Sequence, residues 1–456
     1  MAQNVKSEKS MEKIVSLCKR KGFIFQAGEL YGGLNGCWDY GPLGVELKRN
    51  LKDYWWRKTV QERDDILGLD GSILTMEQVL VASGHVGGFS DPMIDCKTCK
   101  SRFRADNIAT SQCKEKPSVC PGGSPKCELT EPREFNLMLQ TNFGATGDQI
   151  AYLRPETAQS IFVQYKNVLD SSRVKLPFGI AQIGKSFRNE INPRNFTFRS
   201  REFEQMEIEY FCRPEDGLRL TDEWLESRLC FYEQIGIPRS KLHILDVPDG
   251  ERAFYSKKTY DIEYEFPFGI QELEGIAYRT DYDLGVHQKG AGKPLEYFDE
   301  DTKEKLLPHV VEPSAGCDRT ILALICEAYD EETVTDDKGK EEIRTVLHFH
   351  PRMAPVKCGI FPLLKNKPEL VAKAREVQKM LQPFMTVFYD ETAAIGRRYR
   401  RQDEIGTPFG VTIDFDTIGE NGPELKDTVT LRDRDTMEQT RVKIDELLHF
   451  LLERIH

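Results

Sequence analysis

The sequence of 456 residues contains no long apolar run, which argues against a protein anchored by a membrane-spanning helix. No stretch approaches the ~18 consecutive apolar residues that such a helix requires. Residues 1–22 also lack the apolar core of a secretory signal, and they are too acidic and too poor in arginine for a typical transit peptide. We therefore expect a cytoplasmic protein without a membrane partner.

The chain also lacks an excess of positive charge. It carries 63 Lys and Arg residues against 74 Asp and Glu residues, a net charge of -11. This balance excludes a uniformly basic nucleic-acid binder, but nucleic-acid affinity depends on local patches and not on the sum. Residues 352–456 are neutral overall, and residues 396–401, Gly-Arg-Arg-Tyr-Arg-Arg, form the clearest basic patch. A solvated helix face and a phosphate contact are both compatible with this patch.

Twelve cysteines are spread over the chain, and without a secretory signal they indicate reduced thiols instead of a disulfide framework. Cys96 and Cys99 have the spacing of one zinc-ribbon ligand pair. Cys120 with Cys127, or Cys113, would supply the second pair, although six residues separate Cys120 from Cys127 where a ribbon usually has two. A structural Zn²⁺ ion and unliganded thiols remain alternative interpretations.

The length exceeds that of one usual domain, so we expect at least two. Several adjacent strand-like runs in the centre predict an antiparallel sheet flanked by helices, an α+β fold. Residues 90–135 lack this periodicity and indicate an insertion. Strands and helices alternate near the C-terminal end, which predicts a separate α/β domain. The expected division is 1–352 and 353–456.

The most informative segment is 187–210, FRNEINPRNFTFRSREFEQMEIEY. Two alternating runs with a turn near Asn192 predict an antiparallel hairpin, in which Arg188 lies on one run. Phe203, Gln205 and Glu207 share one face of the other run because side chains alternate. Arginines, an aromatic face and carboxylates suit a polyphosphate, a flat base and a cationic amine. The segment therefore predicts binding of a nucleotide and an amino compound.

Two further segments carry polar residues next to apolar helices. Residues 154–159, Arg-Pro-Glu-Thr-Ala-Gln, predict the start of a helix with Pro155 in its first turn and Glu156 near the positive end of the dipole. Residues 312–319, Glu-Pro-Ser-Ala-Gly-Cys-Asp-Arg, place small residues before a helix whose first turn contains Arg319. Small residues allow the backbone to approach a nucleotide, and the arginine can pair with phosphate.

These segments together resemble a known family. Residues 187–190 and 199–203 are similar to motif 2 of class II aminoacyl-tRNA synthetases, and residues 312–319 are similar to motif 3. With the runs 154–159, 203–207 and 272–277, the chain resembles the homodimeric glycyl-tRNA synthetases from about residue 12 to residue 455. The resemblance implies ATP-dependent activation of glycine to glycyl-adenylate and its transfer to the 3′ end of tRNA(Gly).

The resemblance also implies a C-terminal α/β anticodon-binding domain, a homodimer, and ATP and Mg²⁺ as cofactors. In this family pattern, Arg188 holds the α-phosphate, Glu190 lies at the adenylate, Phe203 stacks on adenine and Arg319 holds the terminal phosphate. Glu272 matches the magnesium position. The full set implied for ATP is Arg188, Asn189, Glu190, Phe198, Arg199, Ser200, Arg201, Glu202, Phe203, Glu272, Leu273, Gly316, Cys317, Asp318 and Arg319.

The same pattern implies a second set of residues around the amino acid. They are Arg104, Glu156, Phe203, Glu204, Gln205, Met206, Glu207, Arg279, Glu312, Pro313, Ser314, Ala315 and Gly316. Because glycine has no side chain, we expect selection by exclusion, with polar groups crowded where a larger amino acid would carry a methyl group. Arg102 is an alternative to Arg104.

Three other functions compete with this one. A sister synthetase of other specificity is disfavoured by Glu156, Glu207 and Ser314. A non-catalytic nucleic-acid-binding paralogue would be free to lose the phosphate arginines, which are all present here. A zinc-dependent RNA-binding module has only the cysteine cluster in its favour. Two Gly-containing runs, 85–88 and 290–294, lack the residues of a nucleotide-binding motif.

Overall fold

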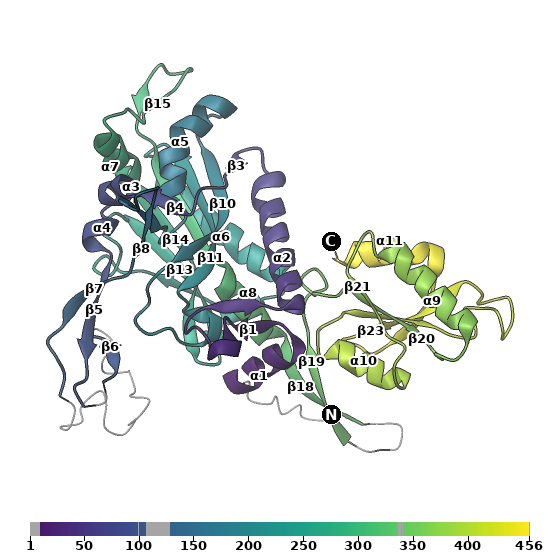
Figure 1. The fold of residues 1–456 in the computed structure, drawn as a ribbon. Coiled ribbons are helices and arrows are strands. Elements are labelled where there is room, and N and C mark those ends of the chain that lie inside the picture. Colours follow the sequence, from purple (N-terminus) through teal and green to yellow (C-terminus); the bar gives the residue numbers. More distant parts are fainter. Residues whose placement is uncertain (1–9, 99, 106–127, 336–338, 340, 456) are drawn as a thin grey trace.

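The computed structural model describes residues 10–98, 100–105, 128–335, 339 and 341–455. Figure 1 shows a large body, coloured from purple to green, and a smaller yellow-green body that contains the C-terminal end. Within the described ranges, no helix is both long enough and apolar enough to cross a lipid bilayer.

A seven-stranded sheet, of order β12-β13-β14-β17-β11-β10-β3, forms the centre of the large body. Neighbouring strands are antiparallel except β10 and β3, which are parallel. The strands are β12 (Leu242–Asp246), β13 (Lys258–Phe266), β14 (Gly269–Thr280), β17 (His309–Gly316), β11 (Glu202–Cys212), β10 (Phe178–Phe187) and β3 (Ile66–Gly68). This largely antiparallel sheet, with helices packed on it, confirms the predicted α+β fold.

The two faces of the seven-stranded sheet pack against different hydrophobic clusters. Met206 and Ile208 of β11 join the main core, whereas Phe211 packs on the other face with residues of α5. Gln205 and Glu207 share the face of Phe211 because side chains alternate along a strand. Helices α2 (Pro42–Trp56), α6 (Gly217–Gln234) and α8 (Cys317–Ala328) cover the first face, and α5 (Ala158–Ser172) and α7 (Tyr282–Ala291) the second.

Shorter elements surround this sheet. Two three-stranded sheets have the orders β4-β9-β8 and β6-β5-β7. Their strands are β4 (Leu74–Met76), β9 (Gln149–Leu153), β8 (Leu139–Phe143), β6 (Arg102–Arg104), β5 (Ser90–Asp95) and β7 (Arg133–Asn136). The remaining elements of this body are α1 (Met11–Lys21), β1 (Ile24–Gln26), η1 (Glu29–Tyr31), β2 (Trp38–Tyr40), the π-helix η2 (Arg57–Gln61), α3 (Glu77–Ala82), α4 (His85–Gly88), η4 (Phe196–Phe198), η5 (Arg239–Lys241), β15 (Tyr297–Phe298), β16 (Lys305–Leu306), β18 (Tyr329–Thr335) and β19 (Glu341–Leu347).

The smaller body is a mixed five-stranded sheet, of order β21-β20-β22-β23-β24, with its own core. The first three strands are parallel, and β23 and β24 add antiparallel edges. Its elements are β20 (Cys358–Pro362), α9 (Pro368–Leu381), β21 (Val387–Tyr389), α10 (Ile395–Asp403), β22 (Phe409–Ile413), β23 (Thr428–Asp433), β24 (Gln439–Lys443) and α11 (Ile444–Ile455). The predicted alternation of strands and helices is present in this body, and β24 follows as an additional edge strand.

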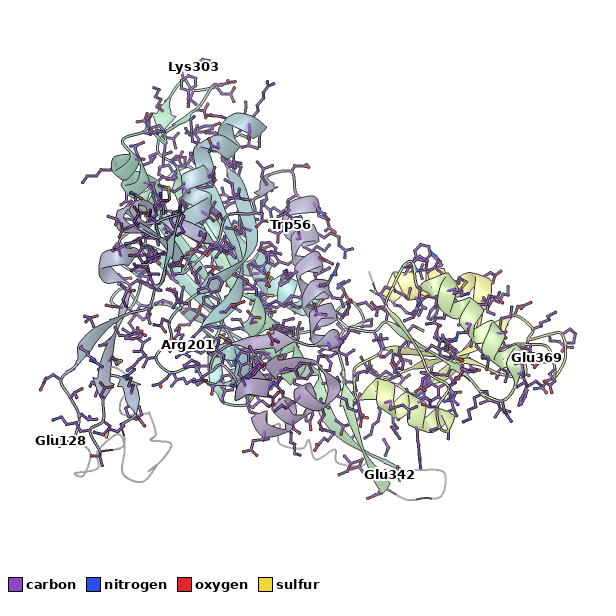
Figure 2. The ribbon with its side chains drawn as sticks, in the orientation of Figure 1. Trp56, Glu128, Arg201, Lys303, Glu342 and Glu369 are labelled. Atoms are coloured by element: carbon purple, nitrogen blue, oxygen red, sulfur yellow. The ribbon has the colours of Figure 1, made fainter. Side chains whose placement is uncertain are left out.

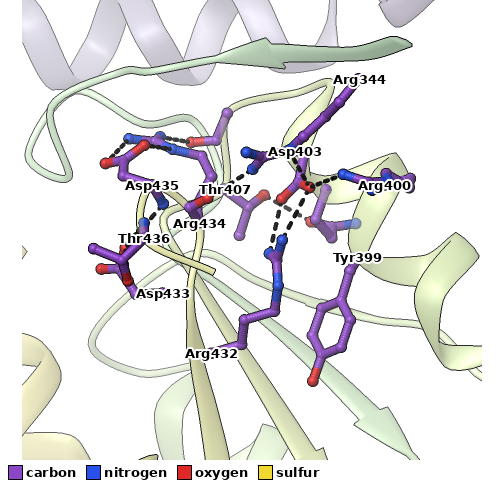
Figure 3. A network of polar contacts seen from close by, with 12 residues as sticks. Arg344, Tyr399, Arg400, Asp403, Thr407, Arg432, Asp433, Arg434, Asp435 and Thr436 are labelled. Atoms are coloured by element: carbon purple, nitrogen blue, oxygen red, sulfur yellow. Dashed lines mark hydrogen bonds and ion pairs between the residues drawn. The ribbon is translucent and has the colours of Figure 1, made fainter. Parts of the chain in front are cut away.

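A buried polar network around Asp403 connects the hairpin β18–β19 to the smaller body (Figure 3). Asp403 accepts hydrogen bonds from Arg344 Nε at 2.9 Å and from Arg432 Nη1 at 3.0 Å. Arg344 also donates to the backbone oxygen of Arg434 at 2.6 Å. Arg344 belongs to β19, whereas its partners belong to α10 and the end of β23, so these contacts fasten one body to the other.

Two predictions about local structure at the cleft are wrong. Helix α5 begins at Ala158, so Pro155 and Glu156 precede the helix instead of forming its first turn. Tertiary hydrogen bonds from Thr157 to β11 hold this segment outside the helix. Strand β10 ends at Phe187, so Arg188 lies in the connecting loop.

Neither interpretation of the basic patch fits Arg398. This residue of α10 is buried, and its guanidinium donates to the backbone oxygens of Pro362 at 2.5 Å and Ala393 at 2.8 Å. Arg401 pairs with Asp390. A pattern of basic residues reveals helix periodicity, but it does not reveal that carbonyl groups of a neighbouring loop will surround one of them.

Candidate active site

A cleft of about 380 Å³ lies where β11, β14 and β17 meet the loop 188–201. Most of the residues predicted for substrate binding line it. They are Glu156, Arg188, Glu190, Phe198, Arg199, Ser200, Phe203, Glu204, Gln205, Glu207, Glu272, Arg279, Glu312, Ser314, Ala315, Gly316, Asp318 and Arg319.

Strand register brings residues that are far apart in sequence into this cleft. Glu207 of β11 is paired with Ser314 of β17, and Gly275 of β14 is paired with the same serine from the other side. Gln205 is paired with Gly316. Because three adjacent strands of one sheet supply these residues, their relative positions are fixed more firmly than loops would allow.

Hydroxyl groups hold Glu207 at one end of the cleft. Ser314 Oγ donates to Glu207 Oε1 at 2.8 Å, and Thr157 Oγ1 donates to Glu207 Oε2. Gln205 Nε2 donates to Ser314 Oγ at 3.4 Å, and Ser186 Oγ donates to Gln205 Oε1 at 2.7 Å. Glu207 is only 1% exposed, so these hydrogen bonds determine its orientation.

Arg279 is held between two carboxylates in the same region. Its Nη1 donates to both oxygens of Glu312 at 2.8 and 2.9 Å, and its Nε donates to Asp283 Oδ2 at 2.7 Å. The Tyr255 ring lies against the guanidinium, with 4.1 Å between Cζ and the ring centroid. Burial opposes the charge, but Glu312 and Asp283 raise the pKa of Arg279 well above its ordinary value.

A second polar chain fixes Glu156. Gln159 Nε2 donates to Glu156 Oε1 at 2.9 Å, and His287 Nε2 lies 2.8 Å from Gln159 Oε1. His85 Nε2 lies 3.5 Å from Glu156 Oε1. Burial alone would raise the pKa of Glu156, but His85 and Arg279 outweigh it and hold that pKa below its ordinary value. Glu156 is therefore ionised at neutral pH.

The neighbouring carboxyl groups have the opposite tendency. Burial and the charges of Glu312 and Glu156 raise the pKa of Glu207 to about 8. Burial also raises the pKa of Glu312, and the adjacent Arg279 only partly offsets it. A cation placed among these groups would favour their ionised forms. This end of the cleft is thus suited to a ligand that carries an ammonium group.

Arginines from motif 2 line another part of the cleft. Arg188 Nε donates to the backbone oxygen of Pro155 at 3.0 Å, and its Cζ lies 5.4 Å from the centroid of the Phe203 ring. Arg199 Nε lies 3.7 Å from Glu190 Oε2. These guanidinium groups provide the charge and the N–H donors that phosphate oxygens require.

Arg319, in the first turn of α8, lies among aromatic and acidic groups. Its Cζ lies 4.5 Å from the centroid of the Phe198 ring, and its Nη1 donates to Glu272 Oε2 at 3.0 Å. Burial and the nearby charges of Glu272 and Glu263 raise the pKa of Asp261 to about 7, with Arg319 opposing the shift. Carboxylate oxygens beside an arginine suit a polyphosphate with a divalent cation.

Asp318 and Glu204 also connect the walls of the cleft. Asp318 Oδ1 accepts from Tyr40 Oη at 2.6 Å and from Lys48 Nζ at 2.8 Å, while its Oδ2 accepts from the backbone N–H of Glu204 at 2.6 Å. Lys52 Nζ donates to Glu204 Oε1 at 2.6 Å. These buried contacts fasten α2 and α8 to β11.

Some predicted residues lie outside the lining of the cleft. Arg104 pairs with Asp91 at 2.7 Å, and Met206 belongs to the core on the opposite face of the sheet. Arg201 donates to the backbone oxygen of Asn35 at 2.7 Å, and Figure 2 shows it in the lower part of the large body. The complete set is Arg104, Asn189, Arg201, Glu202, Met206, Leu273, Pro313 and Cys317.

The predicted zinc ligands fall largely outside the described residues. Cys96 is buried just after β5. Cys99, Cys113, Cys120 and Cys127 lie in ranges that the structure does not describe, so the zinc site stays a prediction.

Sequence reasoning missed several residues of this region, among them His85, Thr157, Tyr255 and Asp261. Thr157 could have been predicted from the sequence, because it directly follows the predicted residue Glu156 and precedes the helix. Asp261 lies on an alternating run that was recognised as a strand, but its role depends on the pairing of β13 with β14. His85 and Tyr255 carry no local signal and reach the cleft only through the tertiary fold.

Comparison with known proteins agrees with this geometry. The profile of the tRNA synthetase class II core domain (G, H, P, S and T) matches residues 143–329, and that of an anticodon binding domain matches residues 357–454.

Full-length relatives narrow the family further. The glycine–tRNA ligase of Treponema denticola is 51% identical over 96% of both chains. The glycine–tRNA ligase of Clostridium perfringens is 52% identical over 96% of this chain and 97% of its own. The glycine–tRNA ligase of Thermobifida fusca is 50% identical over 99% of both chains. This chain therefore belongs to the glycine–tRNA ligase family, a family of class II aminoacyl-tRNA synthetases.

Proposed function

We propose that the cleft joins glycine to ATP and that the resulting glycyl-adenylate donates its glycyl group to the 3′ end of tRNA(Gly). One observation carries this proposal: the carboxylate end built on Glu207 opens into the same cleft as Arg188 and Arg319. An amino acid and a nucleotide can therefore meet within one cleft. Membership of the ligase family supports the same reaction.

The chemistry requires alignment more than proton transfer. The carboxylate of glycine is already a nucleophile, and its oxygen attacks the α-phosphorus while pyrophosphate leaves. In our proposal Arg188 pairs with the α-phosphate, Arg319 pairs with the terminal phosphate and Phe203 stacks on the adenine. Arg319 is paired with Glu272, so phosphate would compete with this carboxylate for the guanidinium.

We place Mg²⁺ at Glu272, with Asp261 as an additional oxygen ligand. The raised pKa of Asp261 supports this placement, because two carboxyl groups close together favour a divalent cation as partner. When bound, Mg²⁺ would neutralise charge on the phosphate oxygens. The residues of the chain then orient the α-phosphate toward the amino acid.

Glycine selection follows from the contacts of Glu207. Its two oxygens already accept hydrogen bonds from Ser314 and Thr157, so the side chain cannot swing aside to admit a larger ligand. In our proposal the ammonium group is bound by Glu156 and Glu207, with Glu312 beside them. A methyl group on the α-carbon would be pressed against these polar side chains, which lose hydration without gaining a partner.

The other elements of the proposal concern the whole chain. We propose that residues 1–352 form the catalytic domain, with residues 90–135 as an insertion, and that residues 353–456 bind the anticodon region of tRNA. We propose a homodimer, and the exposed side chains of Leu30 and Tyr31 in η1 are available to such a contact. Free thiols at Cys18, Cys212 and Cys358 support a reducing, cytoplasmic location.

A structural Zn²⁺ ion bound by Cys96, Cys99, Cys120 and Cys127 completes the proposal. Metal analysis of the purified protein and of a Cys96→Ser variant tests it. One equivalent of zinc in the parent and its loss in the variant are expected. Metal-free protein of full activity would contradict the zinc site without affecting the proposal for the cleft.

Exchange of pyrophosphate into ATP, measured with each of the twenty amino acids, tests the main proposal. We expect exchange that depends on glycine. Exchange with another amino acid alone would favour a sister specificity, and no exchange at all would favour a non-catalytic nucleic-acid-binding role.

A further inference from the structure

Glu209 is a completely buried acidic residue that the proposed reaction does not use. It lies two residues beyond Glu207 on β11 and therefore points to the same face of the sheet. Its exposed fraction is 0%, and neither of its carboxyl oxygens has a hydrogen-bond partner among the described residues. Burial of an ionised carboxylate without a partner is strongly unfavourable in free energy, whereas burial of a neutral carboxylic acid is much less so.

Glu209 is part of a compact carboxyl cluster. One oxygen atom from each of Glu207, Glu209 and Glu312 lies within 4.8 Å of the other two. The positive charge of Arg279 acts on this cluster, but the hydrogen bonds of Arg279 go to Glu312 and Asp283. The cluster thus holds more acidic groups than its cation can neutralise.

The protonation of individual members follows from their partners. Glu312 receives two hydrogen bonds from Arg279, and Glu207 receives the hydroxyl bonds of Ser314 and Thr157. These partners stabilise an ionised carboxylate. Glu209 has no such hydrogen-bond donors, so protonation is most favourable at Glu209 among the three carboxyl groups.

We propose that Glu209 is a positioning residue that remains a neutral carboxylic acid and donates its proton in a hydrogen bond to the Glu207–Glu312 carboxylate pair. The protonated Glu209 supplies these two carboxylates with a hydrogen-bond donor in addition to Arg279, Ser314 and Thr157. The proton stays on Glu209 throughout the reaction. This inference rests on the proposed function, in which Glu207 and Glu312 receive the ammonium group of glycine.

The electrostatics of the cluster agree with this geometry. Burial, with the charges of Glu312 and Glu207 added, raises the pKa of Glu209 well above its ordinary value. Asp283 acts in the same direction, and only Arg279 opposes the shift. Since the pKa of Glu207 is raised to about 8, Glu207 is mostly ionised at pH 9.

Infrared spectroscopy tests the protonation directly. Spectra of the full-length protein and its Glu209→Gln variant are compared at pH 9, where Glu207 is ionised. We expect the parent to show a carbonyl stretch of a protonated, buried carboxylic acid that the variant lacks. If this band is absent from the parent, Glu209 is ionised and the proposal is overturned, whatever the cleft binds.

Glycine kinetics test the positioning role. Glutamine keeps the shape and an N–H donor, so Glu209→Gln should change the glycine KM in pyrophosphate exchange by less than about threefold. Methionine offers no donor, so Glu209→Met should raise the glycine KM about tenfold or more, which corresponds to at least ~1.4 kcal/mol. The KM for ATP should stay unchanged in both, as it should in the exposed control Glu265→Gln.

Two outcomes of these kinetics would overturn the role of Glu209. An equal rise in the glycine KM for both variants would mean that an ionised carboxylate is required. An unchanged glycine KM in both, with the infrared band present, would show that the acid is neutral but that glycine does not bind beside it, which would also overturn the proposed pocket. The spectra and the Gln variant remain decisive if the Met variant does not fold.

Discussion

Ser314 donates its hydroxyl proton to Glu207 at 2.8 Å across the paired strands β17 and β11. The bond links the segment 312–319 to the second strand of the hairpin and fixes the direction in which the carboxylate points. Because both residues are on neighbouring strands of a rigid sheet, the contact cannot relax easily. We propose that the side chain of an amino acid larger than glycine would clash with Ser314 and Glu207.

Replacing Ser314 with alanine removes that bond with little change in volume. We expect Ser314→Ala to raise the glycine KM in pyrophosphate exchange about tenfold, since Glu207 loses a donor that favours its ionised form. The KM for ATP should change by less than about twofold. Ser256→Ala is the matched control, because Ser256 also lines the cleft but its hydroxyl bonds to Lys258 and Thr259 and not to Glu207. An effect on ATP alone would contradict the assignment.

The pH dependence of glycine activation should follow Glu207. Burial and the charges of Glu312 and Glu156 raise its pKa to about 8. Below that pH the free enzyme holds Glu207 as a neutral acid, which binds an ammonium group poorly, and above it the carboxylate is available. We therefore expect kcat/KM for glycine to rise by up to about tenfold per pH unit from pH 6 and to level above pH 8.

The control for this profile is Glu207→Gln, which cannot ionise. Its activity should be low, and the remaining kcat/KM should not rise between pH 6 and pH 8. A parent enzyme whose glycine kcat/KM is flat over this range would contradict the protonation assigned to Glu207. The pH dependence of nucleotide binding alone is measured by equilibrium dialysis. It can then be separated from the pH dependence of glycine activation.

Arg319 should be essential for activation. It is the cation of α8 that faces the cleft, and Arg319→Ala should lower glycine-dependent exchange by about 10²–10³-fold if it stabilises charge on the phosphates. The melting temperature should change little, because the side chain is partly exposed. Exposed Arg397 of α10 offers the matched control as Arg397→Ala. Exchange within threefold of the parent in Arg319→Ala would contradict its role.

The network around Asp403 should matter for tRNA and not for glycine activation. Asp403→Asn leaves Arg344 and Arg432 buried without their carboxylate, a loss of about 3–5 kcal/mol for a buried pair. We expect weaker attachment of the smaller body, so tRNA glycylation should fall about tenfold or more while pyrophosphate exchange stays within twofold.

An exposed ion pair supplies the control for this experiment. Lys367 pairs with Glu420 at the surface of the smaller body, and Glu420→Gln should change neither reaction measurably. If Asp403→Asn slowed exchange and glycylation equally, the network would act on the catalytic cleft itself, and its role as a joint would be wrong.

The elements of the smaller body were predictable because their patterns are local. Residues 368–383 show the helical spacing of apolar side chains, and the structure has a helix at Pro368–Leu381. The hairpin of β10 and β11 was predictable for the same reason. Strand β24 was missed because it is a half-exposed edge strand with few apolar residues.

The cleft was predictable only in part. Motif residues such as Arg188 and Ser314 were identified by resemblance, and alternation placed Gln205 and Glu207 on one face. His85 was not identified, since only tertiary packing brings it within 3.5 Å of Glu156. Glu209 was not singled out either, because burial without a partner cannot be seen in a sequence.

A crystal structure with a non-hydrolysable glycyl-adenylate analogue would show directly whether glycine and nucleotide bind together in this cleft. We expect the ammonium nitrogen to lie about 3 Å from carboxylate oxygens of Glu156 and Glu207, with the phosphate analogue at Arg188 and the adenine ring against Phe203. An analogue bound with its ammonium group at Glu272, or bound outside this cleft, would mean that Glu156 and Glu207 are not the glycine site.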